Sequence, residues 1–575
     1  MPFRLQDIRD TPAGQLLRTL GFQAWLPFPD EAANFETPRF TSSSNDVQPE
    51  SDLSLEKIPS KVSYVADLPQ SDAPRRLSGN GVSDVMIVTW YEDDPENPRN
   101  WSGLKKKWTM LIIILYTFVV YGGASIIAPT AEVVMARYNV SQDVANLGLS
   151  MYIVGCKARY QPMCLSFANH TIHLDGIGPM FFSPISEIPF VGRNPPYLFS
   201  FVLFFIVSII LAVVDSFAAI VVLRFLQGLF GSPALASGAA SIEDIYDMYD
   251  APYGYIWWVA AMYSGPSFGP VMSAYAIPNN WRWGLWEMVI MSGIVLVLLP
   301  FLPETWPPTI LLRRAQRLRA KTGNASYLAA SELKPLNFGS TLLQALSKPI
   351  EISIKDPAIT YACVYCAIVY ATYYSFFEAF PIVYLGTYGM PLGGMSLIFT
   401  TLSVGCAAGV LIYTLYLRYY FIPRARQFYA EKGRPIEPEP WLGAGLVSVW
   451  GVPAGLLIFA WTARPDIHWI APTAGIGIWA AFSFVVFQSI ICWLPPTYPR
   501  YVASLFAAND LTRSLLAAGF VQCTRPMYVR LGIGRGVTVL AGLSFLGILG
   551  HYGLFIFGAK LRARSKFTDT APTTH

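Results

Sequence analysis

The sequence predicts an all-α membrane protein with twelve transmembrane helices arranged in two bundles of six. Of its 575 residues, 53% are hydrophobic and only 14% are charged, whereas soluble domains contain about 25% charged residues. About a dozen apolar stretches of roughly 20 residues follow one another, and each is long enough to cross the ~30 Å hydrocarbon core of a bilayer. A longer polar segment, residues 303–356, divides these stretches into two groups of six.

Residues 1–100 precede the first apolar stretch and are polar, acidic and rich in Pro and Ser. Too little apolar surface is available there to offset the entropy of ordering, so we expect a disordered cytosolic tail. Its first part, DTPAGQLLRTLGF, has the spacing of a short amphipathic helix. A plain unstructured tail is an equally good interpretation of that part.

The N-terminal bundle is expected over residues 101–302 and the C-terminal bundle over 357–558. A cytosolic central loop, 303–356, lies between them, and a cytosolic tail, 559–575, follows them. The predicted spans are 108–129, 144–184, 197–214, 217–240, 254–276 and 283–302 in the first bundle. Those of the second bundle are 357–380, 394–416, 441–462, 469–493, 502–524 and 534–557.

The second span contains an anomaly. Its apolar run stops at Gly155, the polar insert 156–175 intervenes, and an apolar run resumes with GIGPMFFSP. Neither half is long enough to cross a bilayer, but joined together they have the length of one span. We interpret the insert as a retained intron in the gene sequence; the alternative is a re-entrant loop, which would place backbone polar groups in lipid. A spliced transcript that lacks these codons would confirm the artefact.

Lys and Arg in the short loops predict the orientation, because cytosolic loops are enriched in them. Basic residues cluster in the flank 105–107, in the central loop, near 418–426 and in the C-terminal tail. Both termini are therefore expected in the cytosol. The sequon at Asn139 then falls in the first outer loop, where it is a candidate glycosylation site.

Several local sequences resemble the major facilitator superfamily, specifically the fungal twelve-span drug:proton antiporters. They occur in the family's order over about residues 95–560: DPENPRNWSGLKKKW, SEIPFVGRNPPY, RFLQGLFGSP, GPSFGP, LPETWPPTILLRRAQRLRAKTGN, FFEAFP and YPRYVASLFAANDLTRSLLAAG. The resemblance implies the major facilitator fold and transport by alternating access.

One loop and one residue within a span gain roles from this resemblance. Between spans two and three, Glu187 and Arg193 stand for the family's Asp and Arg, although Ser183 replaces a Gly and the spacing is two residues longer. A carboxylate beside a helix N-terminus with a nearby Arg can hold two helices in one state; a solvated turn is the alternative. Arg224 lies inside the fourth span, where a charge is costly, and the resemblance implies proton coupling; a snorkelling or purely structural Arg is the alternative.

The fifth span carries the family's antiporter motif at Gly265, Pro266, Gly269 and Pro270. Small residues allow close helix packing, and Pro bends a helix. The resemblance implies a hinge that limits leakage, with ordinary close packing as the alternative. Ile256 departs from the motif, where the first Gly is expected.

Further ionisable residues lie in the second bundle. Glu378 near the outer end of the seventh span is a candidate protonatable group, or else a residue that only caps the helix. Asp510 and Arg513 are three residues apart in the eleventh span, so they can pair; a structural role is favoured over proton coupling. Aromatic residues of the seventh span form a candidate substrate cavity, namely Tyr370, Tyr373, Tyr374 and Phe377.

These features predict a monomeric, proton-coupled efflux pump of the plasma membrane that exports amphiphilic drugs, toxins or metabolites. The alternatives are an importer of a small nutrient, polyamines included, and a non-transporting receptor. Enzymatic chemistry, catalytic residues, cofactors and nucleic-acid partners find no support in the sequence. No metal site is expected either, since Cys363 and Cys366 lie within an apolar span, where packing is favoured.

Overall fold

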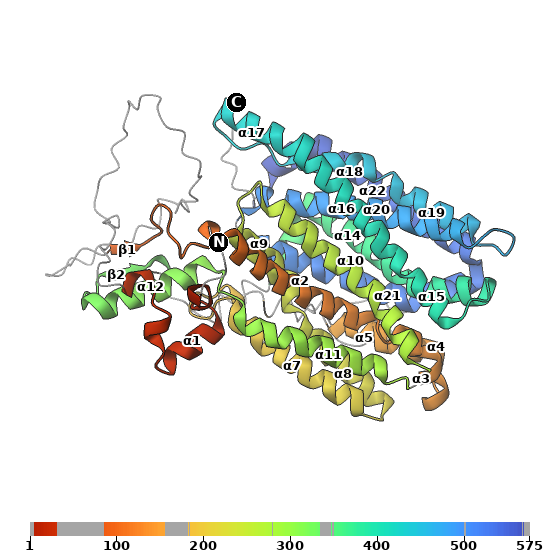
Figure 1. Ribbon diagram of the computed structural model, residues 1–575. Coiled ribbons are helices and arrows are strands. Elements are labelled where there is room, and N and C mark those ends of the chain that lie inside the picture. Colours follow the sequence, from red (N-terminus) through yellow and green to blue (C-terminus); the bar gives the residue numbers. More distant parts are fainter. Residues whose placement is uncertain are drawn as a thin grey trace.

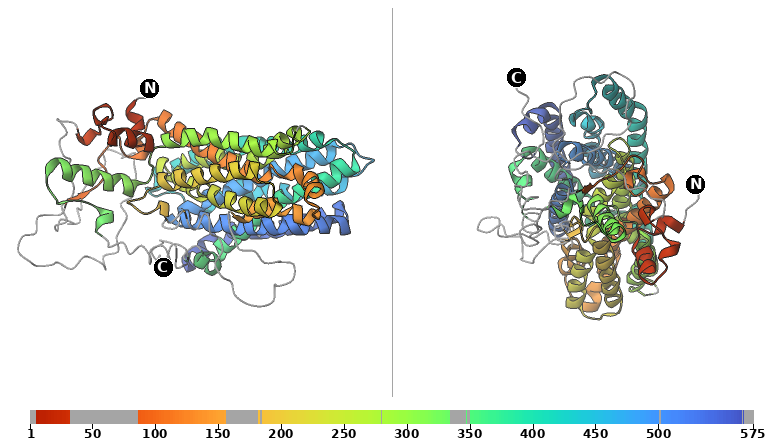
Figure 2. Two further views of the ribbon diagram at one scale, coloured as in Figure 1. Left: turned by 90° about the horizontal axis from the view of Figure 1, so that it is seen from below. Right: turned by 90° about the vertical axis from the view of Figure 1, so that its left-hand side faces the viewer.

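The computed structural model describes residues 5–31, 86–155, 182, 185–278, 280–333, 347, 350–499, 502–565 and 567. Long helices run roughly side by side in an elongated bundle, and a smaller layer of helices and two strands lies at one end (Figures 1 and 2). Among the described residues, eight helices are long and apolar enough to cross a membrane. We call the end near helix α12 the α12 end and the opposite end the far end.

The N-terminal bundle occupies the positions of the first six predicted spans. α2 begins at Gly103, after Ser102 accepts a hydrogen bond from the Lys105 N–H and caps the helix. Short helices η6 (Ala128–Thr130) and α3 (Ala131–Tyr138) follow it at the far end. The other helices are α4 (Gln142–Ala145), α5 (Leu147–Gly155), α7 (Asn194–Val213), α8 (Phe217–Gly231), α9 (Pro233–Ile245), α10 (Ala251–Ala276), α11 (Trp283–Leu298) and η7 (Leu299–Phe301).

The C-terminal bundle repeats this arrangement. Its helices are α14 (Pro357–Phe380), η9 (Pro381–Thr387), α15 (Leu392–Ile398), α16 (Thr400–Tyr416), η10 (Leu417–Phe421), α17 (Ile422–Lys432), η11 (Glu439–Leu442), α18 (Gly443–Ser448), α19 (Gly451–Thr462), α20 (Ile470–Thr497), α21 (Val502–Leu531) and α22 (Ile533–Arg564).

The two halves share the same helix pairings. The first and fifth spans pack together in each half, as α2 with α10 and as α14 with α21. The third span packs against the fourth and the sixth in both halves, as α7 with α8 and α11 and as α19 with α20 and α22. Such repetition is typical of transporters built from internal repeats. The predicted division into two bundles of six is thus confirmed.

The helices extend beyond some predicted span ends at the α12 end. α22 continues to Arg564, past the expected boundary at residue 558, and α17 carries the eighth span on to Lys432. Basic residues in the last turn of a helix interact favourably with its dipole, which supports both extensions. The insert 156–175, interpreted above as a retained intron, lies outside the described residues.

The layer at the α12 end differs from the expected polar loop and disordered tail. α12 (Pro307–Thr322) forms within the central loop, and strand β2 (Tyr327–Ala329) follows it and pairs in parallel with β1 (Met86–Val88). The N-terminal residues 5–31 contain η1 (Leu5–Ile8), α1 (Pro12–Thr19), η2 (Gln23–Trp25) and η3 (Pro29–Glu31). The amphipathic helix expected near residue 12 is therefore present, and a disordered tail is not what the structure gives for residues 5–31 and 86–100.

Basic and acidic side chains connect three loops at the far end. Arg137 donates to Asp215 at 2.7 Å, and Arg282 lies 3.2 Å from the same carboxylate. The loops come from three different connections between spans. The two arginines, isolated in the sequence, thus tie the far-end loops of the first bundle together.

Candidate functional site

A small pocket lies between the two bundles, near the middle of the helices. Its lining residues come from α10, α14, α20 and α21: Met262, Tyr263, Val369, Tyr370, Tyr373, Phe487 and Arg513. The lining is almost entirely apolar and aromatic, apart from one guanidinium. The enclosed space admits about one water molecule, so the two bundles are closed around it.

Arg513 connects the two bundles across this pocket. Its guanidinium pairs with Asp510 on the same helix and donates to the Tyr121 hydroxyl of α2 at 2.9 Å. It also lies 5.0 Å from the ring centroid of Tyr370, within the range of a cation–π contact. The side chain is only 3% exposed. The predicted pairing of Asp510 and Arg513 is confirmed. The pair lies on one helix but faces the interface between the two bundles.

Tyr373 makes a second connection between the bundles. Its hydroxyl donates to the Tyr263 carbonyl of α10 at 2.7 Å and lies 2.8 Å from the Ser267 hydroxyl. Tyr370 and Tyr373, both expected in a substrate cavity, line the pocket. Tyr374 and Phe377 are buried beside them: the Tyr374 ring lies 4.9 Å from that of Tyr370 and 5.5 Å from that of Phe377.

Toward the far end, Glu378 joins the bundles through polar contacts. The Asn146 side-chain amide, at the end of α4, donates to Glu378 at 2.9 Å. Arg525 of α21 lies 3.7 Å from the other carboxylate oxygen. Nearby, Gln522 donates to the Ser150 hydroxyl of α5 at 2.8 Å. No pattern in the sequence predicted a partner for Arg525, which pairs with Glu378 in the structure. Glu378 is 4% exposed and contacts the N-terminal bundle, so it does more than cap its own helix.

Toward the α12 end, aromatic contacts close the same interface. The Phe506 ring of α21 lies 6.0 Å from Tyr255 and 6.3 Å from Trp258, both on α10. Gln488 of α20 also donates to the Pro252 carbonyl, at 3.4 Å. The bundles therefore touch on both sides of the pocket. The contacts toward the far end are polar and include a titratable carboxylate. The contacts toward the α12 end are mainly apolar.

Arg224 lies inside the N-terminal bundle, away from the pocket lining. Its side chain is completely buried, and it donates to the Gly123 carbonyl of α2 at 2.7 Å. The Tyr152 ring lies 5.6 Å away. Within the part of the chain that the structure describes, no carboxylate lies within 4 Å of this guanidinium, and its Nε and one terminal nitrogen lack a hydrogen-bond partner. A buried cation with so few acceptors is costly.

The glycines of the antiporter motif allow two backbones to meet. A Cβ atom at Gly269 would lie 2.2 Å from the Ser125 hydroxyl and 2.7 Å from the Gly122 carbonyl of α2. At Gly265, it would lie 2.7 Å from the Phe118 carbonyl. Pro266 and Pro270 lie inside the same helix. Close packing of α10 on α2 is thus present, while a hinge at this motif stays a prediction.

The loop before α7 has a different carboxylate partner from the one expected. Arg193 pairs with Asp244 at the end of α9, with 2.6 Å between its Nε and the carboxylate. Glu304, from the PETW sequence, accepts hydrogen bonds from the backbone N–H groups of Arg193 and Asn194 at 3.0 and 3.3 Å. The carboxylate at this helix N-terminus is therefore Glu304.

Glu187 takes neither position; its backbone carbonyl accepts from the Trp306 indole at 3.2 Å. Arg193 still attracts the Glu187 carboxylate and opposes the rise of its pKa that burial causes, so the expected role of Glu187 stays a prediction, while Asp244 and Glu304 make the direct contacts with Arg193. Gly192 has φ +79°, and a Cβ there would lie 2.5 Å from Glu304. Only glycine fits this close approach. The PETW sequence itself was the signal for Glu304, whereas nothing in the sequence pointed to Asp244.

Among the described residues, no group of three His, Cys, Asp or Glu side chains is arranged so that it could hold a metal ion. Cys363 and Cys366 are both buried.

Comparison with known proteins gives a consistent result. The model of the Major Facilitator Superfamily matches residues 113–522. The MFS-type transporter pyvG of Aspergillus violaceofuscus is 40% identical, over 84% of this chain and 86% of the relative. The cycloheximide resistance protein of Candida maltosa is 33% identical, over 85% and 87%. Among solved structures, the proton:xylose symporter XylE matches 79% of this chain and 97% of that chain with a TM-score of 0.55, at 13% identity.

Proposed function

This chain belongs to the Major Facilitator Superfamily, and from that premise we propose that it is a proton-coupled efflux pump for small amphiphilic molecules such as drugs, toxins or metabolites. One observation carries the proposal: a pocket between the bundles is lined from both of them and closed on both sides. A transporter that works by alternating access needs such a site.

The lining favours flat, largely apolar cargo. Aromatic rings bind such molecules by stacking without strict geometry, and Tyr370 and Phe487 offer two rings near the Arg513 guanidinium. The guanidinium would donate hydrogen bonds to an acceptor or anionic group of the cargo. Because the pocket admits about one water molecule as it stands, the bundles must separate before cargo enters. The name of the cycloheximide resistance protein supports an organic toxin as cargo.

Proton coupling would use carboxylates that change partners as the bundles rock. Glu378 and Asp510 are the two candidates, because both lie at contacts between the bundles or beside them. Protonation of Glu378 would weaken its acceptance of the hydrogen bond from Asn146, which crosses the interface, and its attraction to Arg525 of its own bundle. Arg224 would respond from within the N-terminal bundle through its contact with α2. We assign gating to Gly265, Pro266, Gly269 and Pro270, and propose that Arg193 restricts motion at the α12 end.

Three properties of the whole protein complete the proposal. The α12 end carries most basic loop residues, so we assign it and both termini to the cytosol. Asn139 lies exposed at the far end and would then be accessible for glycosylation. We propose the plasma membrane as the location and a monomer as the working unit, since the pocket and its closing contacts all come from one chain.

The test is efflux from a yeast strain that lacks its own drug pumps. Cells that express this chain should retain less cycloheximide than control cells and survive higher doses. A proton uncoupler should abolish the difference. Cells that accumulate the compound instead would identify an importer, polyamines being a second panel to screen. Binding without flux in reconstituted vesicles would identify a receptor. Either result would refute the proposed pump.

A further inference from the structure

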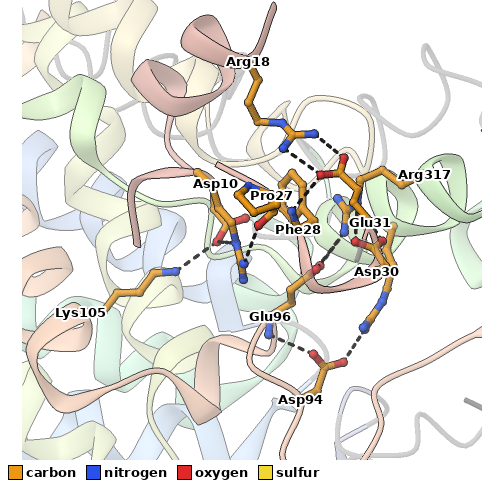
Figure 3. A network of polar contacts seen from close by, with 12 residues as sticks. Asp10, Arg18, Pro27, Phe28, Asp30, Glu31, Asp94, Glu96, Lys105 and Arg317 are labelled. Atoms are coloured by element: carbon orange, nitrogen blue, oxygen red, sulfur yellow. Dashed lines mark hydrogen bonds and ion pairs between the residues drawn. The ribbon is translucent and has the colours of Figure 1, made fainter. Parts of the chain in front are cut away.

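The N-terminal segment, residues 5–31, is held against the α12 end by charged contacts (Figure 3). Arg317 of α12 contacts the Asp30 carboxylate at 2.9 Å, and Lys321 donates to the Asp30 carbonyl at 2.8 Å. Lys105, at the start of α2, lies 3.2 Å from Asp10. These contacts connect the segment to parts of the chain about 95 and 287 residues away in sequence. These contacts pack the segment against the rest of the protein.

Phe28 lies at the centre of these contacts. Its ring is 3.7 Å from the Arg317 guanidinium and 4.6 Å from that of Arg18, close enough for cation–π attraction on both. Glu31 accepts from the Phe28 backbone N–H at 2.9 Å and also pairs with Arg18. One face of the segment is thus buried and its charges are partnered by the protein.

The other face exposes large apolar side chains. Leu16, Leu17 and Leu20 are 61, 42 and 66% exposed, and Phe22 and Trp25 are 43 and 70% exposed. They fall within ten residues of one another. The Phe22 and Trp25 rings also lie 5.4 Å apart. Large apolar side chains exposed so close together mark a contact site.

This apolar face continues the lipid-facing surface of the bundle. α1 packs against η7, the final turn of the sixth span. Ile290, Ile294, Val297 and Phe301 follow one another at spacings of four, three and four residues and are 57, 57, 67 and 37% exposed. They therefore form one face of α11 and η7 that faces lipid. Figure 2 shows α1 in red at the periphery of the α12 end, not over its centre.

We propose that the N-terminal segment docks on the membrane surface, with Leu16, Leu17, Leu20, Phe22 and Trp25 inserted in the headgroup region of the leaflet around the α12 end. An amphipathic segment with Trp and Phe on its apolar side suits that depth. The contacts to Arg317 and Lys105 hold the segment at the height where the apolar surface of α11 ends. The segment thus binds lipid on one face and the transporter on the other.

The experiment measures membrane depth and does not depend on transport. Spin labels are attached at Leu20→Cys and Trp25→Cys in a chain whose seven cysteines are replaced, reconstituted in nanodiscs of phosphatidylcholine and phosphatidylserine. Thr19→Cys and Gln23→Cys are matched controls, because both positions are exposed polar neighbours. Labels at 20 and 25 should collide more with oxygen than with a water-soluble nickel chelate. Labels at 19 and 23 should show the reverse preference.

Two results would overturn the proposal. Equal nickel accessibility at all four positions would place the face in water. Protection of positions 20 and 25 from both reagents would mean that protein, either another part of the chain or a second copy, covers the face. A further variant tests the charged contacts: Arg317→Gln should make the label at position 20 more mobile and reduce its preference for oxygen. An unchanged spectrum would contradict the role of these contacts in holding the segment.

Discussion

Charges at the α12 end and charges inside the helical bundle are paired in different ways. At the α12 end, Arg317 contacts both Asp30 and Glu96, and Arg314 pairs with Asp94, all through carboxylates buried in one layer. Inside the bundle, Arg224 has no carboxylate partner among the described residues. Glu378 accepts a hydrogen bond from the Asn146 amide and lies 3.7 Å from Arg525.

The comparison separates two uses of buried charge. A charge whose partners all lie on one side of the bundle interface stays paired when the bundles rock, so it stabilises the fold in both arrangements. A charge whose partners lie across the interface, or are incomplete, changes its surroundings during the movement and can respond to protons. The predictions that follow test this division, from the largest effect to the smallest.

Replacing Arg224 should have the largest effect. Arg224→Lys keeps the charge but loses the planar set of donors, including the one to the Gly123 carbonyl. We expect uncoupler-sensitive efflux to fall roughly 100-fold, as a lost charge-assisted hydrogen bond in a buried site costs about 3 kcal/mol. The measurement is initial efflux rate at equal surface expression. A rate near that of the unmodified chain would remove Arg224 from the coupling mechanism.

Gly269 tests whether the glycine contact between α10 and α2 matters for transport. Gly269→Leu, or the smaller Gly269→Ala, should separate these helices, because even a Cβ atom there would lie 2.7 Å from the Gly122 carbonyl. We expect uncoupled or strongly reduced transport with protein still in the membrane. Gly519→Ala is the matched control, since a Cβ atom at Gly519 meets nothing within 4 Å. If both Gly269 variants kept normal proton-dependent efflux, the motif would serve only for helix packing.

Glu378 tests titration at the bundle interface. Glu378→Gln imitates the protonated carboxyl and removes the attraction to Arg525. Transport driven by a pH gradient should fall roughly tenfold, the size of one lost charge-assisted contact, while cargo exchange across vesicles stays measurable. Counterflow and pH-driven uptake on the same vesicles distinguish these effects. If both activities fall together in proportion to protein abundance, Glu378 serves stability only.

Glu96 tests the paired layer at the α12 end and should have the smallest effect on transport. Burial raises the pKa of Glu96 to about 7, opposed by Arg317 and supported by Asp10 and Asp30. The pKa of Glu96 in the folded state lies above its ordinary value. The contribution of this carboxyl to the stability of the layer is therefore complete below about pH 4 and is lost as pH rises through 7. Release of residues 5–31 should become about tenfold more favourable between pH 6 and pH 8.

Asp10 contributes in the opposite direction at lower pH. Burial alone would raise its pKa, but Lys105, Arg9 and Arg317 together hold the pKa of this carboxyl below its usual value. Its contribution is therefore present at neutral pH and is lost only in acid.

The mobility of a spin label at position 20 measures the release of residues 5–31. Glu96→Gln should remove the change between pH 6 and pH 8, and a persisting change would assign it to another group.

Much of the architecture could be predicted without coordinates. Span length, the polar division at 303–356 and the order of local motifs led to two bundles of six helices, because the bilayer imposes length and apolarity on each span directly. The pairing of Asp510 with Arg513 also followed from spacing on one helix. Local spacing did not reveal that the pair contacts Tyr121 of the other bundle.

The sequence by itself determined properties that are set within one helix or by the bilayer, namely the spans and the small residues of α10. Only the tertiary structure decided which charges meet. Arg193 pairs with Asp244 and its backbone N–H donates to Glu304, Arg525 lies 3.7 Å from Glu378, and Asp30 of the N-terminal segment contacts Arg317. The physical reason is that an ion pair depends on distances of about 3–4 Å between side chains far apart in sequence. Such distances are fixed by how the helices pack.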